Sequence, residues 1–264
     1  MAATNPSPSG VAVPYCETNG LRLYYEVHGA GPLLVLIHHY FGDSRFTWSR
    51  HVPYFARHYT TLVMDLRGHG YTENPADPRL SHRAMAEDVA GLVQHAGGGP
   101  AHFVGVSTGG MLLQYLAVEH PELVRSLVIS DATYHFKGAE LAAAIATATA
   151  DLDAFRRATG LDTRHGHVHG PEHWRALVAE WPRWAADLSA EHFPPLAALR
   201  AVTAPALIIH GDRDEFFPLE LAIAIYRALP NARLCIAPNC PHLVHAYQPA
   251  FWREAVLRFL SEAG

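Results

Sequence analysis

The chain has 264 residues, of which 49% are hydrophobic and 17% charged, and its formal net charge is −5. These proportions exclude a disordered chain, and the mild charge predicts neither a nucleic-acid partner nor a membrane partner. The three cysteines have no metal-like spacing, so no disulfide framework is expected. No stretch reaches a transmembrane length, and the first ten residues lack the apolar run of a signal peptide. We therefore expect a soluble, cytoplasmic protein.

Strands and helices alternate along most of the chain. The strands are expected at residues 13–16, 21–27, 33–37, 61–64, 102–106, 126–129, 206–210 and 233–236. Helices are expected around 47–57 and at 82–95, 110–117, 219–229 and 250–260. This alternation is typical of an α/β protein with a mostly parallel sheet that helices cover on both faces.

Residues 132–200 have no strand pattern, and we interpret them as a helical cap (lid) inserted into a core formed by residues 1–131 and 201–264. Within the cap we expect a helix at 140–155 and a solvent-exposed loop at 160–170. A further helix should begin at Pro171 and end at Pro182. The loop contains His165, His167 and His169, and its flanking glycines favour exposure over metal binding.

The most informative segment is Gly105-Val106-Ser107-Thr108-Gly109, which stands between a predicted buried strand and a predicted helix. Gly-x-Ser-x-Gly at such a junction is the pattern of a nucleophile elbow. A Cβ at either glycine would crowd the neighbouring strand and helix, so small residues are required there. The N-terminus of the new helix directs its free N–H groups to the same place, which suits an oxyanion.

Four further motifs flank this segment. They are Ile37-His38-His39-Tyr40-Phe41-Gly42, Asp65-Leu66-Arg67-Gly68-His69-Gly70, His210-Gly211-Asp212-Arg213-Asp214 and Pro241-His242-Leu243-Val244-His245. Their order along residues 15–260 resembles that of the α/β-hydrolase superfamily, whose chain order is nucleophile, acid, histidine. The resemblance implies an α/β-hydrolase fold and a catalytic triad of Ser107, Asp214 and His242.

The chemistry of the triad explains these residue types. A serine hydroxyl is a poor nucleophile and needs a base that takes its proton near neutral pH. His242 is the predicted general base and acid, and Asp214 is predicted to fix its tautomer and stabilise the imidazolium. Two other carboxylates compete for the acid role. We expect Asp212 to brace the loop, whereas Asp131 ends a strand where some superfamily members carry their acid.

The oxyanion hole is expected to use the backbone N–H groups of Thr108 and Tyr40. Here the chain departs from the family pattern, because His38-His39 stands where the family commonly has His-Gly. Phe41 therefore stays open as an alternative donor to Tyr40. Pro241 likewise replaces the glycine that usually precedes the catalytic histidine.

The resemblance implies a serine hydrolase, without cofactor or metal, that cleaves a small-molecule carboxylic ester or lactone through an acyl-enzyme on Ser107. Phe41, Trp181, Trp184 and Leu243 are the predicted substrate contacts, and the aromatic cap favours a small to medium apolar or aromatic substrate. A carbon–carbon bond hydrolase or a perhydrolase with the same triad remains open. A non-enzymatic ligand receptor on this scaffold is a further alternative. The sequence leaves the natural substrate and the oligomeric state open.

Overall fold

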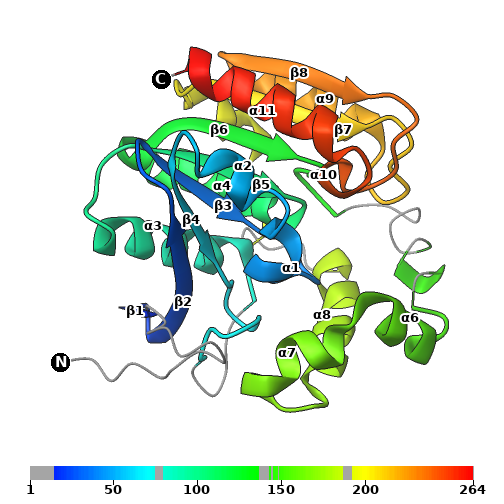
Figure 1. Cartoon of the computed structure of the whole chain (residues 1–264). Helices are drawn as coiled ribbons and strands as arrows, with labels where there is room; N and C mark the ends of the chain where they lie inside the picture. The colour runs from blue at the N-terminus through cyan, green and yellow to red at the C-terminus, as the bar shows by residue number, and fades with distance from the viewer. Residues whose placement is uncertain are drawn as a thin grey trace.

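The computed structural model describes residues 15–74, 80–136, 143, 145–147, 149–186 and 192–263. Its centre is an eight-stranded sheet in the order β1-β2-β4-β3-β5-β6-β7-β8 (Figure 1). The strands are β1 (Tyr15–Thr18), β2 (Leu21–His28), β3 (Leu33–Ile37), β4 (Thr60–Met64), β5 (Ala101–Val106), β6 (Val124–Ser130), β7 (Ala206–Gly211) and β8 (Ala232–Ala237). Strands β1 and β2 pair antiparallel, as do β2 and β4, and every other pairing is parallel. The predicted α/β-hydrolase architecture is confirmed.

The helices follow the strands in chain order. They are α1 (Ser44–Trp48), α2 (Val52–Phe55), α3 (His82–His95), α4 (Thr108–Glu119), α6 (Leu152–Thr159), α7 (Leu161–His169), α8 (His173–Ala186), α9 (Leu219–Ala228), α10 (Val244–Tyr247) and α11 (Pro249–Glu262). Two short 3₁₀ helices, η1 (Pro121–Leu123) and η2 (Leu196–Ala201), precede β6 and β7. None of the described helices is long and apolar enough to cross a membrane.

The sheet separates two hydrophobic cores, and β3 shows why its sequence is a continuous apolar run. Val35 and Ile37 point into the core formed with α3, α4 and α9, whereas Leu34 and Leu36 point into the core formed with α11. Successive side chains of a strand face opposite sides, so a strand covered on both faces must be apolar throughout.

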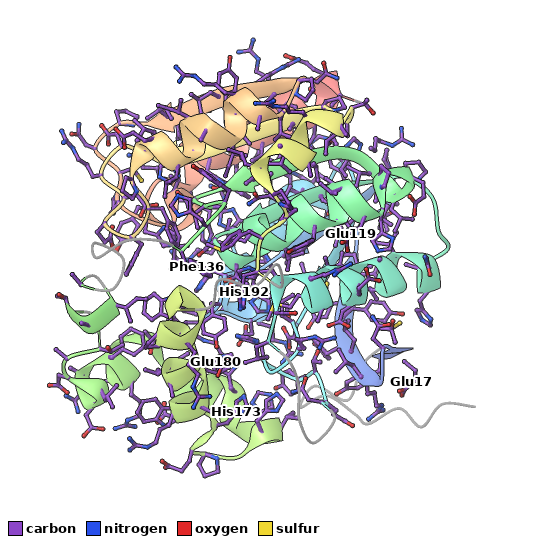
Figure 2. All side chains as sticks on the ribbon, turned by 180° about the vertical axis from the view of Figure 1, so that it is seen from behind. Glu17, Glu119, Phe136, His173, Glu180 and His192 are labelled. Atoms are coloured by element: carbon purple, nitrogen blue, oxygen red, sulfur yellow. The ribbon has the colours of Figure 1, made fainter. Side chains whose placement is uncertain are left out.

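Helices α6, α7 and α8 lie between β6 and β7 in the chain and stand together to one side of the sheet (Figure 1). Among the described residues from 131 to 205 there is no strand, as the sequence predicted. Phe136 and His192 lie between α8 and the helices packed on the sheet, with ring centroids 6.1 Å apart (Figure 2). Part of the predicted 140–155 helix lies outside the described residues, and α6 begins only at Leu152.

Three local predictions were wrong. Residues 47–57 form the two short helices α1 and α2 instead of one. Residues 160–170 are not a loop but contain helix α7, because Leu161 and His165, four residues apart, bury one helical face. Helix α8 continues past Pro182 to Ala186, since a proline removes one helical hydrogen bond and kinks a helix without always ending it.

Candidate active site

The strand-to-helix turn at Ser107 has the strained backbone expected of a nucleophile elbow. Ser107 lies between β5 and α4 with φ 52° and ψ −116°, a conformation that is rare for a residue with a side chain. A Cβ on Gly105 would stand 2.3 Å from the Gly109 carbonyl carbon, and one on Gly109 would stand 2.4 Å from the Ile37 oxygen in β3. Both glycines are therefore required for the close approach of α4 to the sheet, as the sequence predicted.

The structure brings Ser107, His242 and Asp214 together at the carboxyl ends of β5, β7 and β8. His242 Nε2 lies 3.1 Å from Ser107 Oγ, and His242 Nδ1 lies 2.7 Å from Asp214 Oδ2. The other carboxylate oxygen, Asp214 Oδ1, accepts 2.9 Å hydrogen bonds from the backbone N–H groups of Phe216 and Phe217. Those two bonds fix the carboxylate, so the imidazole between Asp214 and Ser107 has one orientation.

The electrostatics of this group favour a charged Asp214–His242 pair. Burial disfavours the imidazolium, but the Asp214 carboxylate, through its charge and its hydrogen bond, together with the charges of Asp131 and Glu215, raises the pKa of His242 above 6.5. Burial likewise opposes ionisation of Asp214, and the His242 charge and hydrogen bond bring its pKa below 3.8. The pair can therefore hold a proton on His242 while Asp214 stays ionised, as a general base requires.

Asp131 and Asp212, the other two carboxylates considered, have different partners. Asp131 Oδ2 accepts hydrogen bonds from Ser130 Oγ at 2.8 Å and from Val244 N at 3.0 Å, and burial raises its pKa to about 6. Asp212 Oδ1 accepts a hydrogen bond from Cys240 N at 3.2 Å, which confirms that it braces this loop. It is Asp214 that makes the hydrogen bond to His242.

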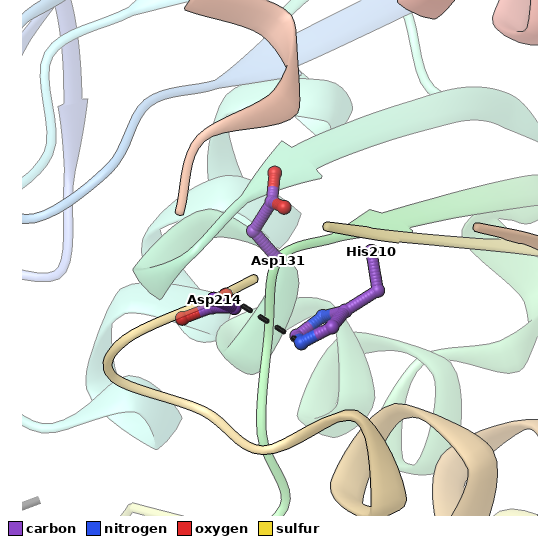
Figure 3. Close-up of side chains that lie close together, drawn as sticks. All are labelled: Asp131, His210 and Asp214. Atoms are coloured by element: carbon purple, nitrogen blue, oxygen red, sulfur yellow. Dashed lines mark ion pairs between the residues drawn. The ribbon is translucent and has the colours of Figure 1, made fainter. Parts of the chain in front are cut away.

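Asp131, His210 and Asp214 also gather closely enough to be considered as metal ligands (Figure 3). His210 Nε2 donates to the Phe217 carbonyl at 2.8 Å and lies 3.5 Å from Asp214 Oδ2. Both carboxylate oxygens of Asp214 already accept hydrogen bonds: Oδ1 accepts two from backbone N–H groups, and Oδ2 accepts one from His242. A cation bound here would compete with His242 for Asp214, so these residues are better suited to hold the imidazole.

The loop after β3 carries the predicted oxyanion donor. Tyr40, Phe41 and Thr108 all line the cavity that contains Ser107. Among the described residues other than glycine, a positive φ occurs at five positions, and His39 is not one of them. Histidine can therefore occupy this family glycine position without backbone strain. After the Pro241-His242 turn, Leu243 adopts the left-handed conformation with φ 69°.

The cavity above Ser107 has a volume of about 250 Å³ and is mainly aromatic. Three predicted substrate contacts, Phe41, Trp181 and Leu243, line it, whereas the Trp184 side chain lies outside the described part of the structure. The cavity is also lined by residues that were not among the predicted substrate contacts, which include Met111, Phe136, Phe155, Glu215, Phe216, Phe217 and Tyr247. Phe216 and Phe217 could have been found from their position directly after Asp214.

Comparison with known proteins shows the family of this chain. A family model described as the alpha/beta hydrolase fold matches residues 32–152. The chain is 32% identical over 252 residues to a pimeloyl-[acyl-carrier protein] methyl ester esterase of Methylococcus capsulatus, with 87% of this chain and 96% of that protein covered. The chain belongs to the α/β-hydrolase family.

Two further similarities extend the comparison. The chain is 27% identical over 270 residues to a 2-hydroxymuconate semialdehyde hydrolase of Pseudomonas sp. strain CF600, with 92% of each covered. Its structure superposes on the meta-cleavage product hydrolase of Pseudomonas fluorescens IP01 with a TM-score of 0.80 at 21% identity, covering 95% of this chain and 98% of the other. At that identity the structural match shows the fold alone, so the reaction must be argued from the site.

Proposed function

We propose that this α/β hydrolase is a cofactor-free serine hydrolase that cleaves a carboxylic ester or lactone. The observation that carries the proposal is the continuous hydrogen-bond chain from Asp214 through His242 to Ser107, with distances of 2.7 and 3.1 Å. It opens into a cavity just large enough for a small to medium substrate. In this arrangement Ser107 is the nucleophile, His242 the general base and acid, and Asp214 the orienting acid.

The reaction proceeds in two acyl transfers. His242 removes the proton from Ser107 Oγ as the oxygen attacks the ester carbonyl, and the imidazolium then protonates the leaving alkoxide. The result is an acyl-enzyme on Ser107 and a released alcohol, or a still-tethered hydroxyl group when the substrate is a lactone. Water then gives its proton to His242 and attacks the acyl-enzyme, which releases the acid and restores Ser107.

The negative charge that develops on the carbonyl oxygen needs hydrogen-bond donors in place before the reaction. We assign this role to the backbone N–H groups of Thr108, at the start of α4, and Tyr40, in the loop after β3. The N-terminal end of a helix directs partial positive charge to the same point. Both residues line the cavity beside Ser107, which supports this assignment.

Substrate selection is assigned to the helical cap at residues 132–200. Phe155 of α6 and Trp181 of α8 line the cavity, and the Trp181 ring lies 4.9 Å from that of Phe41 and 5.5 Å from that of Phe216. Trp174 and Val178 instead pack with Leu161 inside the cap. An apolar or aromatic acyl group fits this lining, because its burial there removes apolar surface from water.

Carbon–carbon bond hydrolysis is the second candidate, and a specific feature favours it. A cavity of about 580 Å³ shares His39, Phe41 and Leu243 with the first and is also lined by Arg50 and Arg164. No acidic residue is among its lining residues in the described part of the chain. The Arg164 guanidinium already contacts the Phe41 and Thr159 carbonyls and the Asp43 carboxylate. Guanidinium groups recognise carboxylates well, so an acid substrate would place its carboxylate against Arg50. A perhydrolase would use the same triad but would not need the second cavity with its arginines.

The test is a substrate screen with the Ser107→Ala variant. The native protein should turn over short p-nitrophenyl esters or lactones, and the variant should lose about three or more decades of kcat. A fluorophosphonate probe should label the native protein and the matched Ser261→Ala control, but not Ser107→Ala. More than a tenth of the activity remaining in Ser107→Ala would disprove the serine mechanism. Turnover of carboxylate-bearing diketones alone would favour carbon–carbon cleavage, and ligand binding without any turnover would indicate a receptor.

A further inference from the structure

The backbone carbonyls of the loop after β3 are held by buried side chains from three different parts of the chain. The His39 carbonyl accepts hydrogen bonds from His38 Nδ1 at 2.7 Å and from Gly42 N at 2.9 Å. The next carbonyl, of Tyr40, faces His69 Nε2, and the one after that, of Phe41, accepts from Arg164 Nη1. Three successive carbonyls thus have side-chain partners, so the carbonyl edge of the loop is fixed.

The orientation of these carbonyls decides the orientation of the N–H groups. In a planar trans peptide the C=O and the following N–H point in opposite directions. Holding the His39 and Tyr40 carbonyls therefore sets the directions of the Tyr40 and Phe41 N–H groups. A misplacement of about 1 Å at a reacting centre can cost about 10²-fold in rate, so these carbonyl contacts matter for catalysis.

His69 contacts this loop from the loop after β4. Its side chain is completely buried, and its Nδ1 lies 2.8 Å from the Arg67 carbonyl. Its ring lies 5.3 Å from each of the rings of His38, Tyr40 and His165. Burial lowers the pKa of His69 to about 4, so near neutral pH the ring is uncharged and has a single N–H, which can be donated to only one of the two carbonyls that face it, that of Arg67 or that of Tyr40.

We propose that His69 is a positioning residue for the oxyanion hole: by donating from Nε2 to the Tyr40 carbonyl it fixes the peptide between Tyr40 and Phe41. This contact sets the direction of the Phe41 N–H and the place of Tyr40 in the loop, while the His39 carbonyl sets the direction of the Tyr40 N–H. Arg164, from helix α7, holds the adjacent Phe41 carbonyl from the cap side. Tyr40 is also tied to the cap through its hydroxyl group, which donates to the Leu177 carbonyl of α8 at 3.1 Å. The proposal rests on the serine hydrolase function assigned above.

The experiment compares three substitutions of His69 that differ in the reach of their donor. In His69→Gln the side-chain NH₂ extends about as far as Nε2 of the imidazole, whereas in His69→Asn it reaches only the Nδ1 position. His69→Leu removes the donor altogether. His165→Asn is the matched control, because His165 is also buried in this cluster but accepts from Gly70 N at 3.0 Å and does not contact the loop carbonyls.

Two inhibitors separate a positioning role from a merely structural one. The serine oxygen adds to the carbonyl of a trifluoromethyl ketone and forms a negatively charged hemiketal, whereas the matching methyl ketone binds without forming this oxyanion. We expect His69→Leu to lower kcat about 10- to 100-fold and to raise Ki for the trifluoromethyl ketone by a similar factor, because a displaced N–H no longer meets the oxyanion. KM and Ki for the methyl ketone should change little.

The conservative variants complete the test. His69→Gln should recover most of kcat, and His69→Asn should stay about tenfold below it, even if His69→Leu fails to fold. His165→Asn should keep kcat near that of the native protein. Equal kcat in the Gln and Asn variants, or equal losses for the two ketones, would overturn the role of His69. If the proposed serine hydrolase function is wrong, the Ser107→Ala variant will instead retain its activity.

Discussion

The sharpest prediction concerns the substitution of Asp214 by Asn, which keeps the shape of the side chain and removes its charge. The Asn oxygen should stay at the Oδ1 position, because the N–H groups of Phe216 and Phe217 both donate to it. The new NH₂ then faces His242 Nδ1 at the position where Oδ2 now lies 2.7 Å away. Two donors cannot face each other, so the imidazole must shift its hydrogen to Nε2.

That tautomer cannot act as the base, since its Nε2 carries a hydrogen and cannot take the proton of Ser107 3.1 Å away. We expect kcat to fall about 10⁴-fold, as wrong-tautomer variants of such triads do, which corresponds to about 5 kcal/mol of lost transition-state stabilisation. The fold should be unaffected, because both backbone hydrogen bonds to Oδ1 are kept.

Asp131→Asn is the matched comparison. Burial raises the pKa of Asp131 to about 6, so its charged form is less stable than that of an exposed aspartate, and the Asn oxygen can still accept from Val244 N and Ser130 Oγ. We therefore expect a loss of kcat within about tenfold. Steady-state hydrolysis of a p-nitrophenyl ester, with circular dichroism and melting temperature as controls, measures both variants. A larger loss for Asp131→Asn than for Asp214→Asn would refute the assignment of the acid.

Three further outcomes are expected. Asp214 raises the pKa of His242 above 6.5, and His242 must be neutral to act as a base, so kcat/KM should fall as the pH drops through that raised pKa. A pH–rate profile that stays flat well below pH 6.5 would contradict this assignment. Trp181→Ala should raise KM for bulky esters and leave KM for acetate esters nearly unchanged, because it removes apolar contact worth about 25 cal/mol per Å². Equal effects on both kinds of ester would show that this side chain belongs to the cap core. Gly109→Ala should destabilise the protein by about 1–3 kcal/mol in denaturant melts, because the added Cβ stands 2.4 Å from a β3 carbonyl, whereas Gly166→Ala in α7 has room and should not.

The central strands of the sheet could be predicted from the sequence because they are buried on both faces. Runs such as residues 33–37 and 206–209 have no polar side chain that would allow another interpretation. The cap was less predictable, since its helices are short and each buries only part of its surface. In α7 the histidines alternate with other residues, which is a pattern with a period of two. The buried residues Leu161 and His165 are four positions apart, and this helical spacing is the one that the structure follows.

The meeting of Ser107, Asp214 and His242 could also be predicted, because each follows a parallel strand and the carboxyl ends of such strands share one edge of the sheet. The carbonyl partners of the oxyanion loop could not. Tyr40 and His69 are 29 positions apart, and Phe41 and Arg164 are 123 apart. The first contact depends on how two loops of the core meet, and the second on how the cap packs on the core; no local pattern in the sequence records either.

The 19 histidines of the chain show that residue type alone does not reveal which histidine takes part in catalysis. A neutral imidazole has one donor and one acceptor at opposite edges of a rigid ring, so it can join a backbone N–H to a backbone carbonyl inside a core. His38 does so, accepting from Leu66 N at 2.9 Å and donating to the His39 carbonyl at 2.7 Å. His210 donates to the Phe217 carbonyl. Burial without a facing carboxylate keeps His38 neutral and structural, whereas the carboxylate of Asp214 raises the pKa of His242 and suits it to carry a proton.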